Sequence, residues 1–565
     1  MAASLAQPPT CTWSSSCQAL EIYRLQAQPP ACTRSSSCQA LESYRLQAGA
    51  CALGHMDNLK TLLLNKIIET HDANSIRNEE LLSFLFMPLH WDNGCTAAEA
   101  AWHTDLYLCS TLRVFCSGPS PILFIRKRVK KVFCLCRKGT VAREACLDGG
   151  TLPERPYAAS LTDFGASGDG VTLNTRAFQA AIAYLQQFST LGGSQLNIPQ
   201  GTWLTGSFNL TSNFTLYLHK DAVILASQNI SDWPIIDPLP SYGRGRERPG
   251  GRHISLIHGE NLNDVIITGD NGTIDGQGSI WWDMWFNHTL EHTRGHLVEF
   301  INSQKIIIFN VVLRDSPFWN IHPVYCDQVI VKDVSILAPR SSPNTDGIDP
   351  DSSTNVCIED CYISNGDDLV ALKSGWDEYG IAYGRPSANI VIRRVIGSTP
   401  FSGIAIGSEM SGGIRDVYIE DVQLFNTGTG IRIKTAPGRG GYVTNITITG
   451  VTMEGVQKAI DVTANAGEHP DANFNPTAFP QIKGIVMNNI VGRNVSYPGR
   501  LLGLQESPLL DICLSQISLN LSTLNVWSCT YVQGSASSVH PAICSDLQSS
   551  QGQLCVSTGS VRTIN

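Results

Sequence analysis

Three aspartates in two short polar segments have the types and spacing that acid–base chemistry needs. Asp346 lies in SPNTDGIDPDSS (342–353), and Asp367 and Asp368 lie in SNGDDLVALKSG (364–375). Asp346 precedes Asp367 by 21 residues, which is close to one coil of a β-solenoid. Adjacent parallel strands lie ~4.8 Å apart, so stacked coils would bring these carboxyls within reach of two-carboxylate hydrolysis. Crowded carboxylates raise one another's pKa, which lets one of them hold a proton at mildly acidic pH.

A further polar motif supplies positive charge. Arg432 and Lys434 alternate on one strand face in GIRIKT (430–435), about two coils beyond the aspartates. The formal net charge of the chain is −9, so a polyanionic ligand requires basic side chains concentrated in one cleft. The same acidity argues against a nucleic-acid partner, because counterion release needs clustered Lys and Arg.

Each motif also has a purely structural interpretation. Asn-Thr-Asp and Gly-Asp-Asp triplets are common in turns, and Arg-x-Lys is an ordinary exposed strand face. Asp346, Asp349 and Asp351 are also oxygen ligands of the kind that Ca²⁺ takes. The joint occurrence of the motifs at coil-like spacing favours a catalytic site, and we predict no metal in it.

A repeated strand pattern predicts how these residues are positioned. Short apolar β patterns recur from about residue 250, and their second apolar positions are Val311, Val334, Cys361, Val395, Val422, Val451 and Ile490. Successive positions are 23 to 39 residues apart, which suits a shared core with loop insertions of unequal length. A propeller needs a longer four-stranded repeat, and a sandwich lacks this iteration. We therefore predict an all-β parallel β-helix over residues 151–565.

Residues 1–150 are predicted to form an N-terminal extension of uncertain structure with no assigned function. Segment 6–26 recurs at 27–47 with three differences in 21 positions, and two copies are too few for a solenoid. Segment 121–136 is both basic and apolar, which is compatible with a nuclear or membrane-surface signal. A neutral extension or a faulty gene-model join is the favoured interpretation. No run of ~18 apolar residues occurs, so no membrane partner is expected.

The order of the motifs resembles the signature of the polygalacturonases, glycoside hydrolase family 28. NTD, GDD, the IGS of FSGIAIGSEMSGG (401–413) and RIK follow one another as in that family. The likeness runs from about Tyr157 to the C-terminus and includes FGASGDGVTLNT (164–175), IDGQG (274–278) and SPFWNIHPVYC (316–326). The extended segments SPNTDGIDPDSS and GSEMSGG are similar to those of plant probable polygalacturonases and bacterial exo-acting members.

The resemblance implies a right-handed parallel β-helix that hydrolyses α-1,4 galacturonic acid linkages of pectin, with inversion and without a cofactor. At the matched positions, Asp367 resembles the proton donor to the glycosidic oxygen. Asp346 and Asp368 resemble the pair that activates water on the opposite face of the sugar. Arg432 and Lys434 resemble the residues that bind the galacturonate carboxylate.

Two departures from the family pattern concern the surroundings of the acid. Family members usually carry Gly-His-Gly ahead of IGS, whereas this chain has Pro-Phe-Ser-Gly at 400–403. No clear equivalent of the family's substrate-stacking Tyr occurs near AIDVTAN (459–465). His322 is a candidate to replace the missing His in space and to bind substrate, the alternative being weakened activity. Asn344 of the NTD triplet is a second substrate-binding candidate.

Cysteines and glycosylation sequons favour an exported protein. Cys513, Cys529, Cys544 and Cys555 crowd the C-terminus, where disulfides are favoured over buried thiols. Eight N-x-[ST] sequons lie at Asn209, Asn213, Asn229, Asn271, Asn287, Asn445, Asn494 and Asn520. Met1 is followed by a polar stretch without the pattern of a signal peptide, so export is inferred against the N-terminus as written.

We therefore expect a secreted, glycosylated, monomeric cell-wall hydrolase with a pectic polysaccharide as substrate. Exo attack is favoured over endo attack, because the insertion between Asp368 and Ser402 would wall off one end of the cleft. Two other functions stay open: a hydrolase of a rhamnose-containing pectin backbone, and a pectin-binding β-helix without turnover. A pectate lyase is disfavoured, since that chemistry needs Ca²⁺ and an arginine base.

Overall fold

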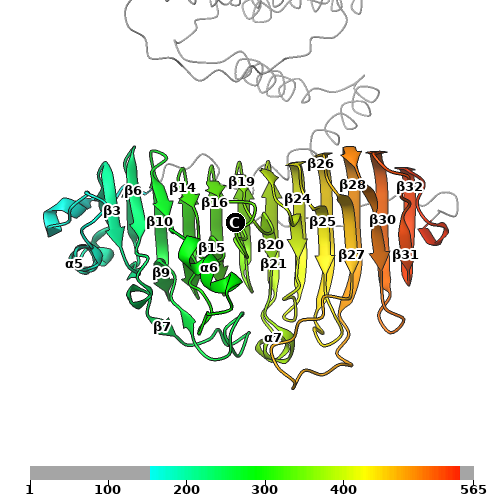
Figure 1. The fold of residues 1–565 in the computed structure, drawn as a ribbon, viewed down its shortest axis with the longest axis horizontal. Helices are drawn as coiled ribbons and strands as arrows, with labels where there is room; N and C mark the ends of the chain where they lie inside the picture. The colour runs from blue at the N-terminus through cyan, green and yellow to red at the C-terminus, as the bar shows by residue number, and fades with distance from the viewer. Residues whose placement is uncertain (1–152, 548–565) are drawn as a thin grey trace, which may run out of the picture. The chain divides into compact units, whose positions relative to one another are not determined.

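The computed structural model describes residues 153–547. Parallel strands stack coil upon coil along one axis, from the cyan end at α5 to the red end at β32 (Figure 1). The predictions for residues 1–150 and for Cys555 lie outside the described residues.

Each coil contributes strands to three faces. The first face contains β1 (Tyr157–Ser160), β2 (Ser194–Ile198), β5 (Phe214–Leu218), β10 (Asn263–Gly269), β13 (Gln304–Phe309), β16 (Asp327–Lys332), β18 (Thr354–Glu359), β21 (Ser387–Arg393), β24 (Ile414–Phe425), β26 (Tyr442–Glu454), β28 (Gln481–Val495), β30 (Leu509–Leu521) and β32 (Val532–His540). The second face contains β3 (Gly201–Thr205), β6 (Ala222–Ala226), β11 (Thr273–Asp275), β14 (Val312–Arg314), β17 (Ser335–Leu337), β19 (Tyr362–Ser364) and β22 (Ile396–Ser398), and it joins the first face through β24.

The third face, called the cleft sheet below, carries the predicted site. It contains β4 (Phe208–Asn209), β9 (Ile257–Glu260), β12 (Val298–Ile301), β15 (Ile321–Val324), β20 (Val370–Leu372), β23 (Ser402–Ile406), β25 (Thr429–Lys434), β27 (Lys458–Thr463), β29 (Tyr497–Leu502) and β31 (Ser528–Thr530). Single bridges from Ile348 to Ile321 and to Val370 connect β15 with β20.

Short elements cover the coils at their ends and bends. These are the antiparallel pair β7 (Ile235–Ile236) and β8 (Arg252–His253), the helices α5 (Thr175–Gln186), α6 (Ser279–Phe286) and α7 (Asp377–Tyr383), and the 3-10 turns η1 (Leu161–Phe164), η2 (Ser189–Leu191), η3 (Ile230–Asp232) and η4 (Ser545–Leu547). Among the described residues, no helix combines the length and the apolar character that crossing a membrane requires.

The repeat predicted from the sequence forms the core. All seven anchor residues, from Val311 to Ile490, are buried in one continuous hydrophobic cluster. Val422, Val451 and Ile490 lie in register on β24, β26 and β28, so each coil places its apolar side chain against the same position of its neighbours. This stacking confirms the parallel β-helix, because the apolar residues of one coil are buried only by the coils on either side.

Residues with a left-handed backbone conformation bend the chain at a position that recurs from coil to coil. Asn355, Asn389, Asp416 and Asn445 have φ between 55° and 57° at the same register position. Asn and Asp tolerate this conformation better than other non-glycine residues do. The Asn389 amide also donates to Asn355 Oδ1 at 3.2 Å, so the bend of one coil contacts that of the next.

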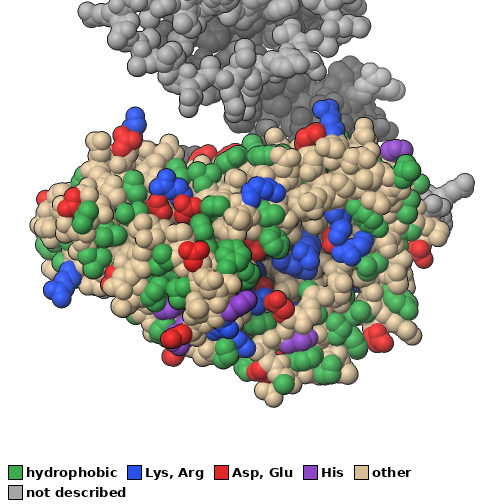
Figure 2. Space-filling view, viewed as in Figure 1, with side chains coloured by type: hydrophobic (Ala, Val, Ile, Leu, Met, Phe, Trp, Pro, Cys, Tyr) green, Lys and Arg blue, Asp and Glu red, His purple; other side chains and the backbone are tan. Residues whose placement is uncertain are grey.

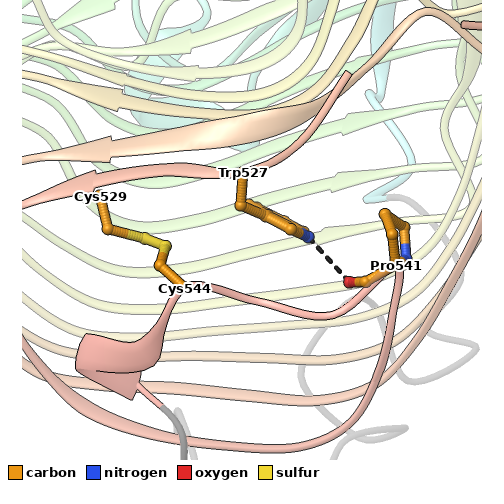
Figure 3. The surroundings of a disulfide bond; sticks show 4 residues. All are labelled: Trp527, Cys529, Pro541 and Cys544. Carbon is orange, nitrogen blue, oxygen red and sulfur yellow. Dashed lines mark hydrogen bonds between the residues drawn. A yellow bond between two sulfur atoms is a disulfide. The ribbon is translucent and has the colours of Figure 1, made fainter. Parts of the chain in front are cut away.

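The C-terminal end of the solenoid is closed by a disulfide. Cys529 of β31 is bonded to Cys544, and the Trp527 indole donates to the Pro541 carbonyl at 3.0 Å beside it (Figure 3). A disulfide among the C-terminal cysteines is therefore confirmed. A solenoid needs such closure, because its last coil has no neighbour to bury its open edge.

Candidate active site

The three predicted aspartates converge on the cleft sheet. The Gly347 amide donates to the Asp368 carbonyl at 2.9 Å, which stacks Asp346 beside Asp368 on the next coil. Each of Asp346, Asp367 and Asp368 offers a carboxylate oxygen within 4.8 Å of the other two, and all three residues are buried. The 21-residue spacing thus does correspond to one coil, as predicted.

Asp368 is held in its ionised form. Burial by itself raises the pKa of this carboxyl, but Lys434 and the Ser402 amide more than offset the effect and leave the pKa lowered. Lys434 Nζ lies 2.7 Å from Asp368 Oδ2, and the Ser402 amide donates to Oδ1 at 2.8 Å. Lys434 lies on β25, and its ammonium group extends past β23 to pair with the Asp368 carboxylate two coils earlier.

Asp367 has the opposite environment, although it precedes Asp368 directly. Burial, followed by the charges of Asp346 and Asp368, raises the pKa of Asp367 well above its usual value. Its carboxyl accepts from the Asp368 amide at 2.8 Å and from Asn344 Nδ2 at 3.4 Å. Arg294 in turn donates to Asn344 Oδ1 at 2.8 Å and fixes the orientation of that amide. Asp367 is thus suited to carry a proton.

The pKa of Asp346 lies between those of Asp367 and Asp368. Burial raises its pKa to about 6, with Lys373 opposing the shift and Asp368 adding to it. Lys373 Nζ is 3.8 Å from Asp346 Oδ2. A group with this pKa is largely ionised at neutral pH and can accept a proton from water.

Sequence reasoning missed the charged residues that surround Asp346. Lys373 Nζ contacts Glu409 at 3.3 Å and Asp349 at 3.6 Å, and it lies 4.2 Å from the centre of the Trp319 ring. Lys373 and Asp349 belong to the two polar segments that carry the aspartates; Lys373 was left unassigned there, and Asp349 was considered only as an oxygen ligand of Ca²⁺. Glu409 lies in the FSGIAIGSEMSGG segment (401–413), but its contact with Lys373 was not predictable because the two residues lie on different coils.

The predicted substrate-binding residues occupy two different surroundings. Lys434 contacts Asp368, whereas Arg432 lies two residues away on β25, between Ala405 and Asp461 of the neighbouring strands. Arg432 Nε is buried with no hydrogen-bond partner among the described residues. Figure 2 shows Lys and Arg side chains gathered beside a hollow near the middle of this face.

His322 is fully buried on β15, and carboxylates face both of its ring nitrogens. Nδ1 lies 2.9 Å from Glu299 Oε1, and Nε2 lies 3.4 Å from Asp351 Oδ2. Burial acts to lower the pKa of His322, but these two carboxylates leave it raised. Neither carboxylate belongs to the three aspartates. The side chain that donates a hydrogen bond to Asp367 is Asn344, and the His322 imidazole does not take this place.

Within residues 153–547, two carboxylate-containing clusters have ligand atoms close enough for a cation: the three aspartates, and His296 with Glu299 and His322. In the first cluster, the Lys434 and Lys373 ammonium groups already provide positive charge at 2.7 and 3.8 Å. In the second, Arg252 Nη1 contacts both Glu299 oxygens at 2.9 Å. These built-in cations disfavour a metal ion in either place.

A parallel β-helix with carboxyl groups of separated pKa and adjoining cations on one sheet has the architecture of an acid–base hydrolase for an anionic polymer. Residues 192–540 match the family model of the glycosyl hydrolases family 28. The chain is 53% identical over 416 residues to the "Probable polygalacturonase" of Vitis vinifera, covering 73% of this chain and 84% of that protein. This chain belongs to glycosyl hydrolase family 28.

Solved structures agree with this assignment. The exopolygalacturonase from Thermotoga maritima has a TM-score of 0.57 at 27% identity, with 68% of this chain and 93% of that chain covered. The polygalacturonase from Erwinia carotovora ssp. carotovora has a TM-score of 0.56 at 22% identity, covering 69% and 98%, and supports the fold alone. The family resemblance and the right-handed parallel β-helix are both confirmed.

Proposed function

We propose that this protein hydrolyses α-1,4 galacturonosyl linkages of pectin, with Asp367 as the general acid. The observation that carries the proposal is the divergence in pKa between adjacent residues, raised for Asp367 and lowered for Asp368. One carboxyl group then holds a proton for the glycosidic oxygen while its neighbour stays ionised. Arg432 and Lys434 provide the positive charge that attracts a uronate.

In this mechanism, Asp367 transfers its proton to the oxygen of the scissile linkage as the C–O bond breaks. Asp346 and Asp368 take a proton from the water that attacks the opposite face of the sugar. The oxygens of these carboxyls approach within 4.8 Å, which is shorter than the ~6.5–9.5 Å typical of inverting pairs. Inversion therefore rests on family membership, and NMR of the first-formed anomer tests it.

The loops beside the site support exo attack. The insertion after Asp368 contains α7, and Tyr379 of α7 donates to Asp471 at 2.8 Å. The Trp376 indole also donates to the Glu468 carbonyl at 3.2 Å, so the insertion is fastened to residues 92 positions later. We propose that the insertion, fastened in this way, walls off one end of the cleft. Early release of monomer without a rapid fall in viscosity supports exo attack, and a viscosity drop that outpaces reducing-sugar release overturns it.

Export and glycosylation are also part of the proposal. Seven of the eight sequon asparagines have exposed side chains, and Asn213 is half-buried, so all are compatible with attached glycans. We propose a secreted monomer that acts in the cell wall, with the family domain beginning near residue 151. Glycosidase sensitivity of the protein recovered from plant medium, together with its mass in solution, tests these points.

The decisive experiment is Asp367→Asn assayed by reducing-end release from polygalacturonate. We expect at least ~100-fold slower hydrolysis, since a positioned general acid contributes about 10²–10⁴-fold. Asp546→Asn is the matched control, because it makes the same change at an exposed carboxyl in η4, after the last strand of the solenoid. Undiminished hydrolysis by Asp367→Asn rejects this acid. Binding of polygalacturonate by the unaltered protein without any product identifies a binding protein instead.

A further inference from the structure

A buried lysine, Lys373, lies among acidic groups beside the catalytic aspartates. It directly follows β20, and its ammonium group lies 3.3 Å from Glu409, 3.6 Å from Asp349 and 3.8 Å from Asp346. The side chain is only 4% exposed, and its Nζ lies 4.2 Å from the centre of the Trp319 ring. Because a buried ammonium group is unfavourable without a charge of opposite sign, these carboxyl groups decide which charge Lys373 offsets.

Glu409, the nearest of the three, has a second cation. Arg246 Nη2 contacts Glu409 Oε1 at 2.7 Å, and Arg246 Nε donates to the same oxygen at 2.8 Å. Burial acts to raise the pKa of Glu409, but Lys373 and Arg246 leave it well below its ordinary value. Arg246 therefore offsets the Glu409 charge at the shorter distance, which leaves the charge of Lys373 available to another carboxylate.

Asp349 holds a proton and needs no cation. Both of its carboxyl oxygens are buried without a hydrogen-bond partner among the described residues. Burial, followed by the charge of Asp346, raises the pKa of Asp349 well above its usual value. An ionised carboxylate with two unpaired oxygens is strongly unfavourable in the interior of a protein, so we expect the neutral form.

The cations around the site then match the ionised carboxylates one to one. The pairs are Lys434 with Asp368, Arg246 with Glu409, and Lys373 with Asp346. This pairing leaves no cation for Asp349 and Asp367, and these are the two carboxyl groups whose pKa is raised well above its usual value. The arrangement of cations thus separates the carboxyl groups that hold a proton from those that accept one.

Asp346 depends on Lys373 for its positive charge. In the described part of the chain, Lys373 is the one cation paired with Asp346 within 4 Å. The other charged or titratable groups that face Asp346 from the stacked coils are Asp349, Asp367, Asp368, Glu409 and Lys434. On the earlier coils, Arg252 and His322 both contact Glu299 instead. Carboxyl groups outnumber cations around Asp346, so its charged form should be lost when Lys373 is removed.

We propose that Lys373 is a positioning residue of the reaction, whose charge keeps the Asp346 carboxylate ionised and in place for the water that attacks the sugar. The proposal rests on the proposed function, since it concerns the group that takes a proton from this water. Lys373 acts through Asp346. Glu409 opposes this role, because it attracts the same ammonium group and adds a like charge near Asp346.

The pH dependence of kcat/KM on polygalacturonate tests this role in the full-length protein. Asp346 has a pKa of about 6, so kcat/KM should decline below about pH 6, and this decline is called the acidic limb below. Lys373→Met removes the charge and should move the acidic limb to higher pH by at least about one unit. Glu409→Gln removes the competing carboxylate and should move the acidic limb to lower pH. A purely structural role of Lys373 does not produce shifts in opposite directions.

Two control variants separate charge from packing. Lys373→Arg keeps a positive charge, so its acidic limb should stay near pH 6 even where kcat/KM is lower. Lys332→Met makes the same change as Lys373→Met at a lysine that pairs with Glu359 on the first face, and it should leave the profile unchanged. An acidic limb that stays in place in both Lys373→Met and Glu409→Gln overturns the proposal. If a thermal melt shows that Lys373→Met does not fold, Glu409→Gln decides alone.

Urea unfolding tests the same pair without substrate. Lys373→Met, Asp346→Asn and the double variant together give the coupling between the two residues. At pH 7, where Asp346 is ionised, we expect a coupling of at least about tenfold in the unfolding equilibrium constant. At pH 5, where Asp346 is mostly protonated, the coupling should be no more than about threefold. Equal coupling at the two pH values contradicts the role of Lys373.

The two measurements distinguish this proposal from the proposed function. Hydrolysis of polygalacturonate with acidic limbs that do not move rejects the role of Lys373 alone. A coupling that depends on pH, in a protein that does not hydrolyse polygalacturonate, rejects the enzyme function and leaves the pairing of Lys373 with Asp346 in place.

Discussion

Replacing Lys434 with Met tests whether this cation keeps Asp368 ionised. The two charges are 2.7 Å apart, and Asp368 is fully buried. With an effective dielectric constant of ~20, Coulomb's law gives an attraction of about 6 kcal/mol at this distance. Part of this attraction offsets the desolvation of the pair, so loss of one partner should reduce the unfolding free energy by about 3–5 kcal/mol at pH 7.

The loss of stability should depend on pH with a defined sign. In the unaltered protein the pKa of Asp368 is lowered, so the carboxylate stabilises the fold above its unfolded pKa of ~3.9. Without Lys434, burial and the neighbouring aspartates would raise that pKa above its ordinary value. The folded variant would then bind a proton at acidic pH, and the destabilisation should shrink as pH falls from 7 towards 4.

Urea unfolding of Lys434→Met, Asp368→Asn and the double variant measures this coupling. We expect a coupling free energy of at least ~1.5 kcal/mol at pH 7, because the partners are close and poorly solvated. Asp368→Asn should also make the stability effect of Lys434→Met smaller and less dependent on pH, because Lys434 then acts only on the pKa values of Asp346 and Asp367. A coupling below ~0.5 kcal/mol, or a Lys434→Met effect that is equal at pH 4 and pH 7, would refute the assigned ion pair.

Three further predictions concern acid–base behaviour and closure of the solenoid. The ratio kcat/KM should fall below about pH 6, where Asp346 takes up a proton, and again at higher pH, where Asp367 loses its proton; a profile flat from pH 4 to 8 contradicts these roles. Burial and Asp346 raise the pKa of Asp349 well above its usual value, so ionisation of Asp349 lowers the unfolding free energy as pH rises. Asp349→Asn should therefore reduce the decline in unfolding free energy between pH 4 and 7. An unaltered decline rejects the raised pKa of Asp349. Cys529→Ser should lose about 3 kcal/mol in urea unfolding, as the chain-entropy model gives for a 15-residue loop, and no loss in the oxidised protein contradicts it.

The sequence alone determined the solenoid and the position of its acid groups. Regular recurrence of Val, Ile and Cys anchors, such as Val422, Val451 and Ile490, is local information that every coil repeats. The spacing from Asp346 to Asp367 then fixes which aspartates meet, since one coil brings residues of that separation side by side. The fold class and the convergence of the three carboxyls were therefore predictable. The sequence suggested His322 as the side chain that supports the acid, whereas in the structure Asn344 contacts Asp367.

Only the tertiary structure decided what each group does. Asp367 and Asp368 are identical neighbours in the chain, yet their pKa values move in opposite directions, because Lys434, 66 residues later, contacts one of them alone. The nitrogens of Arg252 and His296 that are unpaired among the described residues were likewise not predictable, since neither residue belongs to a motif and each nitrogen lacks a partner only because of its burial in the fold. The periodicity of apolar residues can be read from short stretches of sequence. Desolvation and charge pairing depend instead on which distant side chains the fold brings into contact.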